Sequence, residues 1–137
     1  MTGNLIYLAS PYSHPSKDVV TKRFNDVCVA CAKLMKMGIH IYSPIAHTHP
    51  VAMVGELPTS WDYWKVYDTK MLSACDELWV LTLDGWEESK GIAGEIEIMK
   101  EFNKPIWHIS PNHIYDDRYM IHRYVDGEFM AFEYQKV

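Results

Sequence analysis

The feature that most constrains this chain is an alternation of short apolar segments with longer segments of helical periodicity. We predict buried strands for the short segments, over residues 4–10, 39–43, 76–83 and 104–110. Helices are predicted between them, over residues 16–38, 61–75 and 90–102. Because strands that alternate with helices form parallel sheets, we expect one α/β domain over residues 1–137, with helices on both faces of the sheet.

The first helix is predicted by an apolar stripe at steps of three and four residues, formed by Val20, Phe24, Val27, Cys31 and Leu34. Ser16 is placed to cap its start, and Gly38 is placed to end it. Cys28 and Cys31 form a C-x-x-C pair inside this helix, whereas redox pairs lie at a helix start, where a thiolate is stabilised. We therefore expect both cysteines to pack in the core.

Two segments carry weaker signals. Residues 44–60, "PIAHTHPVAMVGELPTS", contain three prolines and a glycine. They are predicted as a long irregular loop, of the kind that is usually functional or mobile in a compact domain. The last segment allows two interpretations: a hairpin that turns at Asp126-Gly127, or a helix followed by an extended segment.

Composition limits the partners of the chain. A net charge of -5 does not suit a protein that binds duplex nucleic acid, although a small phosphorylated substrate needs only a local anion site. No apolar run approaches 18 residues, so no membrane span is expected. The first residues lack the pattern of a signal peptide and the three cysteines form an odd set, so we expect a cytoplasmic protein with reduced thiols.

Parallel sheets bind ligands at the carboxyl ends of their strands. In this chain the loops at that edge are residues 9–16, 43–60 and 83–91. The last of these loops leads into "SKGIAGE", in which Gly91 and Gly94 let a backbone approach a ligand. The Ser89 hydroxyl and the free amides of a helix start would form an anion site. Glu95, one turn further, can act there as a nucleophile or a general base.

Simpler interpretations of these residues stay open. Ser89 can be a plain N-cap, with Glu95 complementing the helix dipole. Asp68, on the preceding helix, is either a solvated residue or a second carboxylate of the site. Such a pair serves glycosyl transfer, since one carboxylate attacks the sugar carbon and the other manages protons. Glu97 is a rival of Glu95, but it points roughly 200° away around the helix and is expected to face solvent.

Over residues 5–109 the chain resembles the nucleoside 2-deoxyribosyltransferase superfamily, which also contains the 2'-deoxynucleoside 5'-phosphate N-hydrolases. The superfamily's first strand is similar to "IYLAS", which puts the pocket tyrosine at Tyr7. Its supporting aspartate falls on Asp68 in "DTKMLSACDELWVL". Its nucleophile falls on Glu95 and its sugar or phosphate contact on Ser89, both in "SKGIAGE". "NKPI" also resembles the segment before the fourth strand, and the chain looks most similar to a bacterial and phage branch.

The resemblance implies a Rossmann-like, flavodoxin-like sheet of 4–5 strands and a covalent glycosyl–glutamate intermediate. Water resolves that intermediate in the hydrolases, and a second base resolves it in the transferases. Ser89 stands where the transferases often carry an aspartate, and a serine can donate to a phosphate. We therefore expect an N-glycosidase that acts on (deoxy)nucleoside 5'-monophosphates. The alternatives are a 2-deoxyribosyltransferase with the same site and a non-catalytic nucleotide-binding or sensing module.

Further expectations concern ligands and assembly. Substrate contacts are expected from Tyr7, Ser10, Tyr12, His47, Ser89 and Gly91. No cofactor is expected, and the partner is a small nucleoside or nucleotide. The resemblance also implies a homodimer or a larger homo-oligomer, because members of the superfamily usually complete each active site with a neighbouring subunit.

Several side chains near these loops allow two interpretations. Trp61, Trp64 and Trp86 can stack on a nucleobase or pack in the core or at a dimer interface. His47 and His49 would share a face and could bind a metal if their segment were extended, although a pocket-lining or surface pair is favoured. Two arginines of the tail, Arg118 and Arg123, either reach a phosphate across an interface or are ordinary surface charges.

Overall fold

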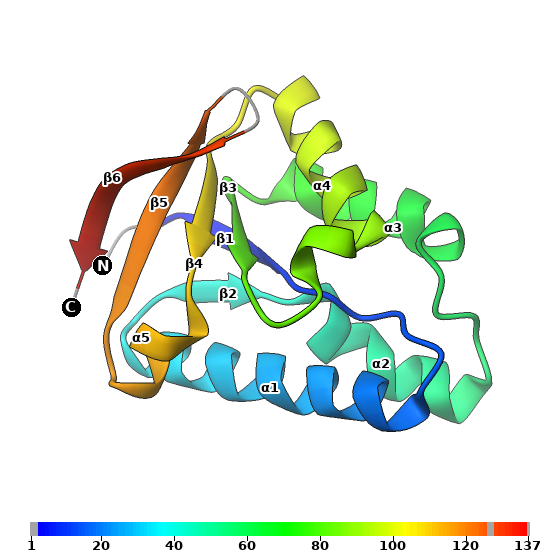
Figure 1. Cartoon of the computed structure of the whole chain (residues 1–137). Helices are drawn as coiled ribbons and strands as arrows, with labels where there is room; N and C mark the ends of the chain where they lie inside the picture. Colours follow the sequence, from blue (N-terminus) through cyan, green and yellow to red (C-terminus); the bar gives the residue numbers. More distant parts are fainter. Residues whose placement is uncertain (1–2, 126–127, 137) are drawn as a thin grey trace.

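The computed structural model describes residues 3–125 and 128–136 as one sheet with helices on both faces (Figure 1). The sheet has six strands in the order β2-β1-β3-β4-β5-β6. Four strands are parallel: β1 (Leu5–Ala9), β2 (His40–Tyr42), β3 (Glu77–Leu81) and β4 (Ile106–Ile109). Two strands continue the sheet in antiparallel fashion: β5 (Tyr119–Val125) and β6 (Glu128–Lys136). The predicted α/β class and its Rossmann-like sheet are confirmed. The sheet has six strands where 4–5 were expected, because β5 and β6 extend the four parallel strands.

The helices form two layers, one on each face of the sheet (Figure 1). One layer contains α1 (Lys17–Lys36), α2 (Pro44–Gly55) and α5 (Pro111–Tyr115). The other contains α3 (Trp61–Ala74) and α4 (Lys90–Glu101). A short 3-10 turn, η1 (Trp86–Glu88), precedes α4. None of the helices in the described part of the chain is long and apolar enough to cross a bilayer.

Strand β1 shows why both faces of the sheet are buried. Ile6 and Leu8 point into the core beneath α1, whereas Tyr7 and Ala9 point into the core beneath α3 and α4. Side chains of successive strand residues alternate between faces, so an apolar run without polar interruptions is suited to a strand covered on both sides. The same alternation places the Tyr7 ring on the face that carries α3 and α4.

The predicted loop over residues 44–60 is wrong for its first two thirds, because residues 44–55 form α2. Ser43 caps this helix by accepting a hydrogen bond from the amide of Ala46 at 3.1 Å. Pro44 occupies the first turn, where its missing amide hydrogen is not needed. Pro50 lies inside the helix and removes one internal hydrogen bond. The sequence signals of a loop and of a proline-started helix therefore overlap here.

The tail adopts the hairpin interpretation, since β5 and β6 pair in antiparallel fashion. The predicted turn at Asp126-Gly127 lies outside the described residues. The hairpin extends the sheet beyond β4, on the side opposite to β2 (Figure 1).

The strand order places a ligand-binding edge between β1 and β3. The chain leaves β1 to form β2 on one side, and then returns to form β3 on the other side of β1. Loops that leave the carboxyl ends of such neighbouring strands diverge, and a crevice opens between them. In this protein the diverging loops are residues 10–16 after β1 and residues 82–89 after β3.

Candidate functional site

A cavity of about 560 Å³ lies at the carboxyl ends of β1 and β3. Its walls come from the loop after β1, from α1, α2 and α3, and from the loop that leads into α4. Six of the eight predicted site residues line it: Ser10, Tyr12, Asp68, Ser89, Gly91 and Glu95. A seventh, Tyr7, lies beneath the cavity and contacts Glu95.

Glu95 lies in the second turn of α4 on its inward face, and only 4% of its surface is exposed. The hydroxyl of Tyr7, which is fully buried, donates a hydrogen bond to Oε2 of Glu95. Burial raises the pKa of Glu95 to about 8; the bond from Tyr7 lowers it, and the charge of Asp68 raises it further. Burial and the neighbouring carboxylates raise the pKa of Tyr7 well above its ordinary value, so Tyr7 stays protonated as the donor.

Asp68 is the second buried carboxyl group of the cavity. It projects from the middle of α3, which packs against α4, and 7% of its surface is exposed. Its Oδ1 atom is buried and has no hydrogen-bond partner. Desolvation raises the pKa of Asp68 to about 7. The interpretation of Asp68 as a solvated helix residue is therefore wrong.

Asp68 and Glu95 titrate as a coupled pair. Because burial raises both pKa values, the pair together holds about one proton between pH 7 and pH 8. One carboxyl group is then a proton donor while the other is an anion. A site with these two forms side by side can supply an acid and a nucleophile in the same step.

Ser89 both caps α4 and lines the cavity. Its Oγ accepts a hydrogen bond from the amide of Ile92 at 3.2 Å, as the N-cap interpretation expects. The hydroxyl hydrogen remains available to a ligand. The first turn of α4 carries no acidic side chain of its own, so the partial positive charge of the helix start is available to an anion there. Gly91, in that turn, has room for a Cβ atom, with its nearest neighbours at 3.7 and 3.8 Å.

Ser10 and Tyr12 come from the loop after β1. The Oγ of Ser10 is buried without a hydrogen-bond partner in a residue that is 5% exposed. The hydroxyl of Tyr12 lies 2.6 Å from Nδ1 of His49, which holds the phenol against the cavity wall. The His49 ring itself stacks on Phe24, with centroids 4.2 Å apart.

The structure does not bring His47 into the cavity with the other predicted site residues. His47 lies on the exposed side of α2, where its ring faces Tyr67 with the centroids 6.4 Å apart. The helix is the physical reason, because residues two positions apart on a helix point to opposite sides. His47 and His49 therefore do not form a metal pair, and the described residues contain no cluster of three metal-binding side chains.

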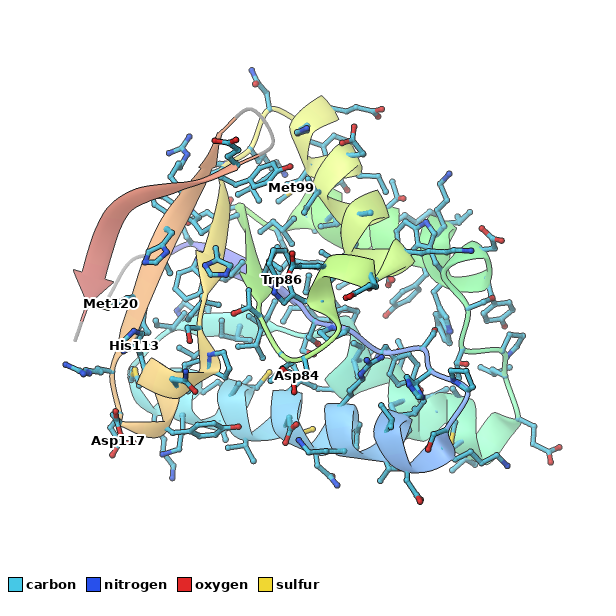
Figure 2. All side chains as sticks on the ribbon, viewed as in Figure 1. Asp84, Trp86, Met99, His113, Asp117 and Met120 are labelled. Carbon is cyan, nitrogen blue, oxygen red and sulfur yellow. The ribbon has the colours of Figure 1, made fainter. Side chains whose placement is uncertain are left out.

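The other aromatic and basic candidates divide between the cavity and the rest of the surface. Trp61 and Trp64 line the cavity. Trp86 instead packs beside His108, with ring centroids 5.6 Å apart (Figure 2). In the tail, Arg118 is exposed and the guanidinium of Arg123 lies 5.1 Å from the ring of Trp107.

Sequence reasoning missed Arg23, which lines the cavity from α1. The signal was its place, three residues after the buried Val20 in the first two turns of the helix that follows β1. A helix that follows a parallel strand begins at the ligand-binding edge of the sheet, so its first turns face the site.

A protein-family model described as "Domain of unknown function (DUF1937)" matches residues 4–110. The matched region includes all the cavity-lining residues discussed above. No curated protein matches the chain.

Proposed function

The chain belongs to the family described as "Domain of unknown function (DUF1937)", and we propose from its cavity that it is an N-glycosidase of (deoxy)nucleoside 5'-monophosphates. The observation that carries the proposal is the pair of buried carboxyl groups, Asp68 and Glu95, that face one cavity with raised pKa values. The resemblance to nucleoside 2-deoxyribosyltransferases assigns the same two residues to catalysis. The burial of these two carboxyl groups and the resemblance therefore support the same pair of residues.

The proposed reaction begins from the form of the pair in which the single proton lies on Asp68 and not on Glu95, a form that the hydrogen bond from Tyr7 to Glu95 favours. The Glu95 carboxylate then attacks the anomeric carbon of the sugar. The bond between this carbon and the base nitrogen breaks, and its electron pair stays on the nitrogen. Asp68 in its protonated form gives its proton to the leaving base. A water molecule then hydrolyses the glycosyl ester of Glu95 and passes its proton to the Asp68 carboxylate. Both carboxyl groups return to their starting protonation states.

Tyr7 orients Glu95 in this scheme. Its hydroxyl bonds to Oε2 of Glu95, so the carboxylate rotates less freely, with its other oxygen, Oε1, free to attack. The same hydrogen bond favours the ionised form of a side chain that burial would otherwise keep neutral.

The remaining cavity wall suits a nucleotide. Trp61, Trp64 and Tyr12 supply flat apolar surfaces on which a base can stack. Ser10 offers a buried hydroxyl without a partner, and Ser89 with the start of α4 offers donors to a phosphate. A volume of about 560 Å³ lies within the range of small-molecule sites.

The test is a product assay on a panel of nucleosides and 5'-monophosphates, each with and without a second free base. We expect base release from monophosphates without an acceptor, and a loss of about 1,000-fold or more in Glu95→Gln, since the nucleophile is removed. The matched control is Glu97→Gln, on the exposed side of the same helix, which should keep wild-type activity. Release that requires the second base would replace hydrolysis by transfer. Full activity in Glu95→Gln would overturn the site.

A further inference from the structure

Arg23 is a cation built into the cavity wall. Its Nη1 donates to the carbonyl oxygens of Ser13 at 2.9 Å and Tyr12 at 3.4 Å, both in the loop after β1. Its Nη2 donates to the carbonyl oxygen of Asp84 at 3.4 Å. Asp84 lies in the loop after β3 (Figure 2). The guanidinium is therefore fixed between the two loops that diverge at the ligand-binding edge.

The loop after β3 is shaped around this guanidinium. Gly85 has a φ of 91°, a conformation that side chains disfavour. A Cβ atom at Gly85 would also collide with Nη2 and lie 3.3 Å from Cζ of Arg23. The glycine thus permits both the turn and the close approach of the charged group.

The charge of Arg23 is not neutralised by a carboxylate. Among the described residues, ion pairs join Lys22 to Asp26, Lys33 to Asp117 and Lys100 to Glu97, and none of them includes Arg23. Of the five N–H donors of a guanidinium, the three bonds to carbonyl oxygens leave two for a ligand. A fixed cation with free donors, facing a cavity, is complementary to an anion.

We propose that Arg23 binds the phosphate of the substrate and sets the preference for nucleoside monophosphates over nucleosides. The inference rests on the proposed function, because it names the group that this same site selects. The cavity needs such a cation, since Asp62, Glu88 and the catalytic carboxyl groups also line it and repel a phosphate. Lys90 lines the cavity too, but it is exposed and its flexible side chain is not held by the loops.

A purely structural role makes a different prediction. If Arg23 only ties the two loops together, its removal loosens the site for every substrate. The ratio of kcat/KM for a monophosphate to that for the matching nucleoside would then stay constant. If Arg23 binds phosphate, this ratio falls.

The experiment measures that ratio for wild type, Arg23→Gln, Arg23→Lys and the control Lys22→Gln. We expect a fall of about 10- to 100-fold in Arg23→Gln, the range for hydrogen bonds to a charged group, and a smaller fall in Arg23→Lys, which keeps the charge but loses the planar fork. Lys22 is the adjacent cation, and it is exposed and paired with Asp26. The ratio of kcat/KM values measured for Lys22→Gln should therefore equal that of wild type. An unchanged ratio in Arg23→Gln would overturn the inference.

A binding measurement separates this inference from the proposed reaction. Inorganic phosphate should raise the melting temperature of wild type and of Lys22→Gln, and should do so much less in Arg23→Gln. If nothing is hydrolysed but phosphate stabilises the protein through Arg23, the reaction fails and the anion site stands. If monophosphates are hydrolysed equally well by Arg23→Gln, and phosphate does not stabilise wild type, the anion site fails and the reaction stands.

Discussion

Glu95 lies in surroundings that disfavour an ionised side chain, and a buried carboxyl group of this kind is what its proposed catalytic role predicts. The residue is 4% exposed, and its pKa lies near 8 instead of its ordinary 4.5. A carboxyl group whose pKa is higher in the folded than in the unfolded state stabilises the folded protein fully only below the pKa of the unfolded state. This stabilisation is lost as the pH rises through the pKa of the folded state. Functional sites tolerate such losses because the reaction needs the group there.

The stability of Glu95→Gln should therefore depend on pH relative to wild type. At pH 5 the two proteins should unfold at similar temperatures, because Glu95 is protonated. At pH 9 the variant should be more stable by about 5 kcal/mol, since only wild type must ionise a buried carboxyl group. Thermal unfolding followed by circular dichroism measures the difference, with Glu97→Gln as the exposed control. A variant less stable than wild type at pH 9 would contradict the buried charge.

The coupled carboxyl groups predict a bell-shaped pH dependence of kcat/KM. Activity should rise as the pair loses its first proton near pH 7, and fall as it loses the second near pH 8. In Asp68→Asn the residual activity should lose its alkaline decline, because no acid remains to titrate. The remaining acid limb should report Glu95 alone, with a pKa below about 8 because the charge of Asp68 no longer raises it. An unshifted bell in Asp68→Asn would contradict the assignment.

The sequence was sufficient to select Asp68, Glu95, Ser89 and Tyr7, because each belongs to a short motif with a fixed place on a strand or helix. It was not sufficient for Arg23, whose proposed function depends on two loops that meet only in the fold. The position of His47 outside the cavity was not predictable for a similar reason, since its direction changes with the conformation of a proline-rich segment.

At the scale of elements, the site is assembled by the contact between α3 and α4. These helices pack closely at Gly94, where a Cβ atom would lie 2.7 Å from Nε1 of Trp61. The glycine lets the indole of Trp61 lie against α4 while it also lines the cavity. The periodicity of both helices predicted their existence, but their close approach at this residue depends on tertiary packing.

Gly94→Ala should destabilise the protein even though alanine favours helices. The new methyl group displaces the Trp61 ring, and such overpacking costs about 1–3 kcal/mol. Gly91→Ala, in the same helix, meets only ordinary contacts and should leave stability unchanged or raise it by up to about 1 kcal/mol. Urea unfolding measures both variants. Equal stabilisation by both would show that Trp61 does not pack on Gly94.

At the scale of the whole molecule, one sheet joins two cores. Leu8 of β1 belongs to the core beneath α1, and its neighbour Tyr7 belongs to the core beneath α3 and α4. The alternation of apolar segments was enough to predict this arrangement, because a strand without polar positions must be covered twice. The hairpin at the end of the sheet remained one of two interpretations, since its short-range turn signal competed with a helical pattern.

The shared sheet predicts a single cooperative unfolding transition. Leu8→Ala should lower stability by about 3 kcal/mol, because it leaves a cavity at a fully buried position. Far-ultraviolet circular dichroism and tryptophan fluorescence should report the same midpoint in wild type and in the variant. Val54→Ala, at a position that is 90% exposed, serves as the control. Two separate transitions would contradict a single domain.

The central claim is that Glu95 forms a covalent bond to the sugar. The most direct measurement is mass spectrometry of protein quenched in acid during turnover of a 2'-deoxynucleoside 5'-monophosphate, with Asp68→Asn included to slow the release of the sugar. We predict a gain in mass equal to a deoxyribose phosphate group, located on the peptide that contains Glu95 and absent from Glu95→Gln. Base release at the wild-type rate by Glu95→Gln, or an adduct on another residue, would contradict this account.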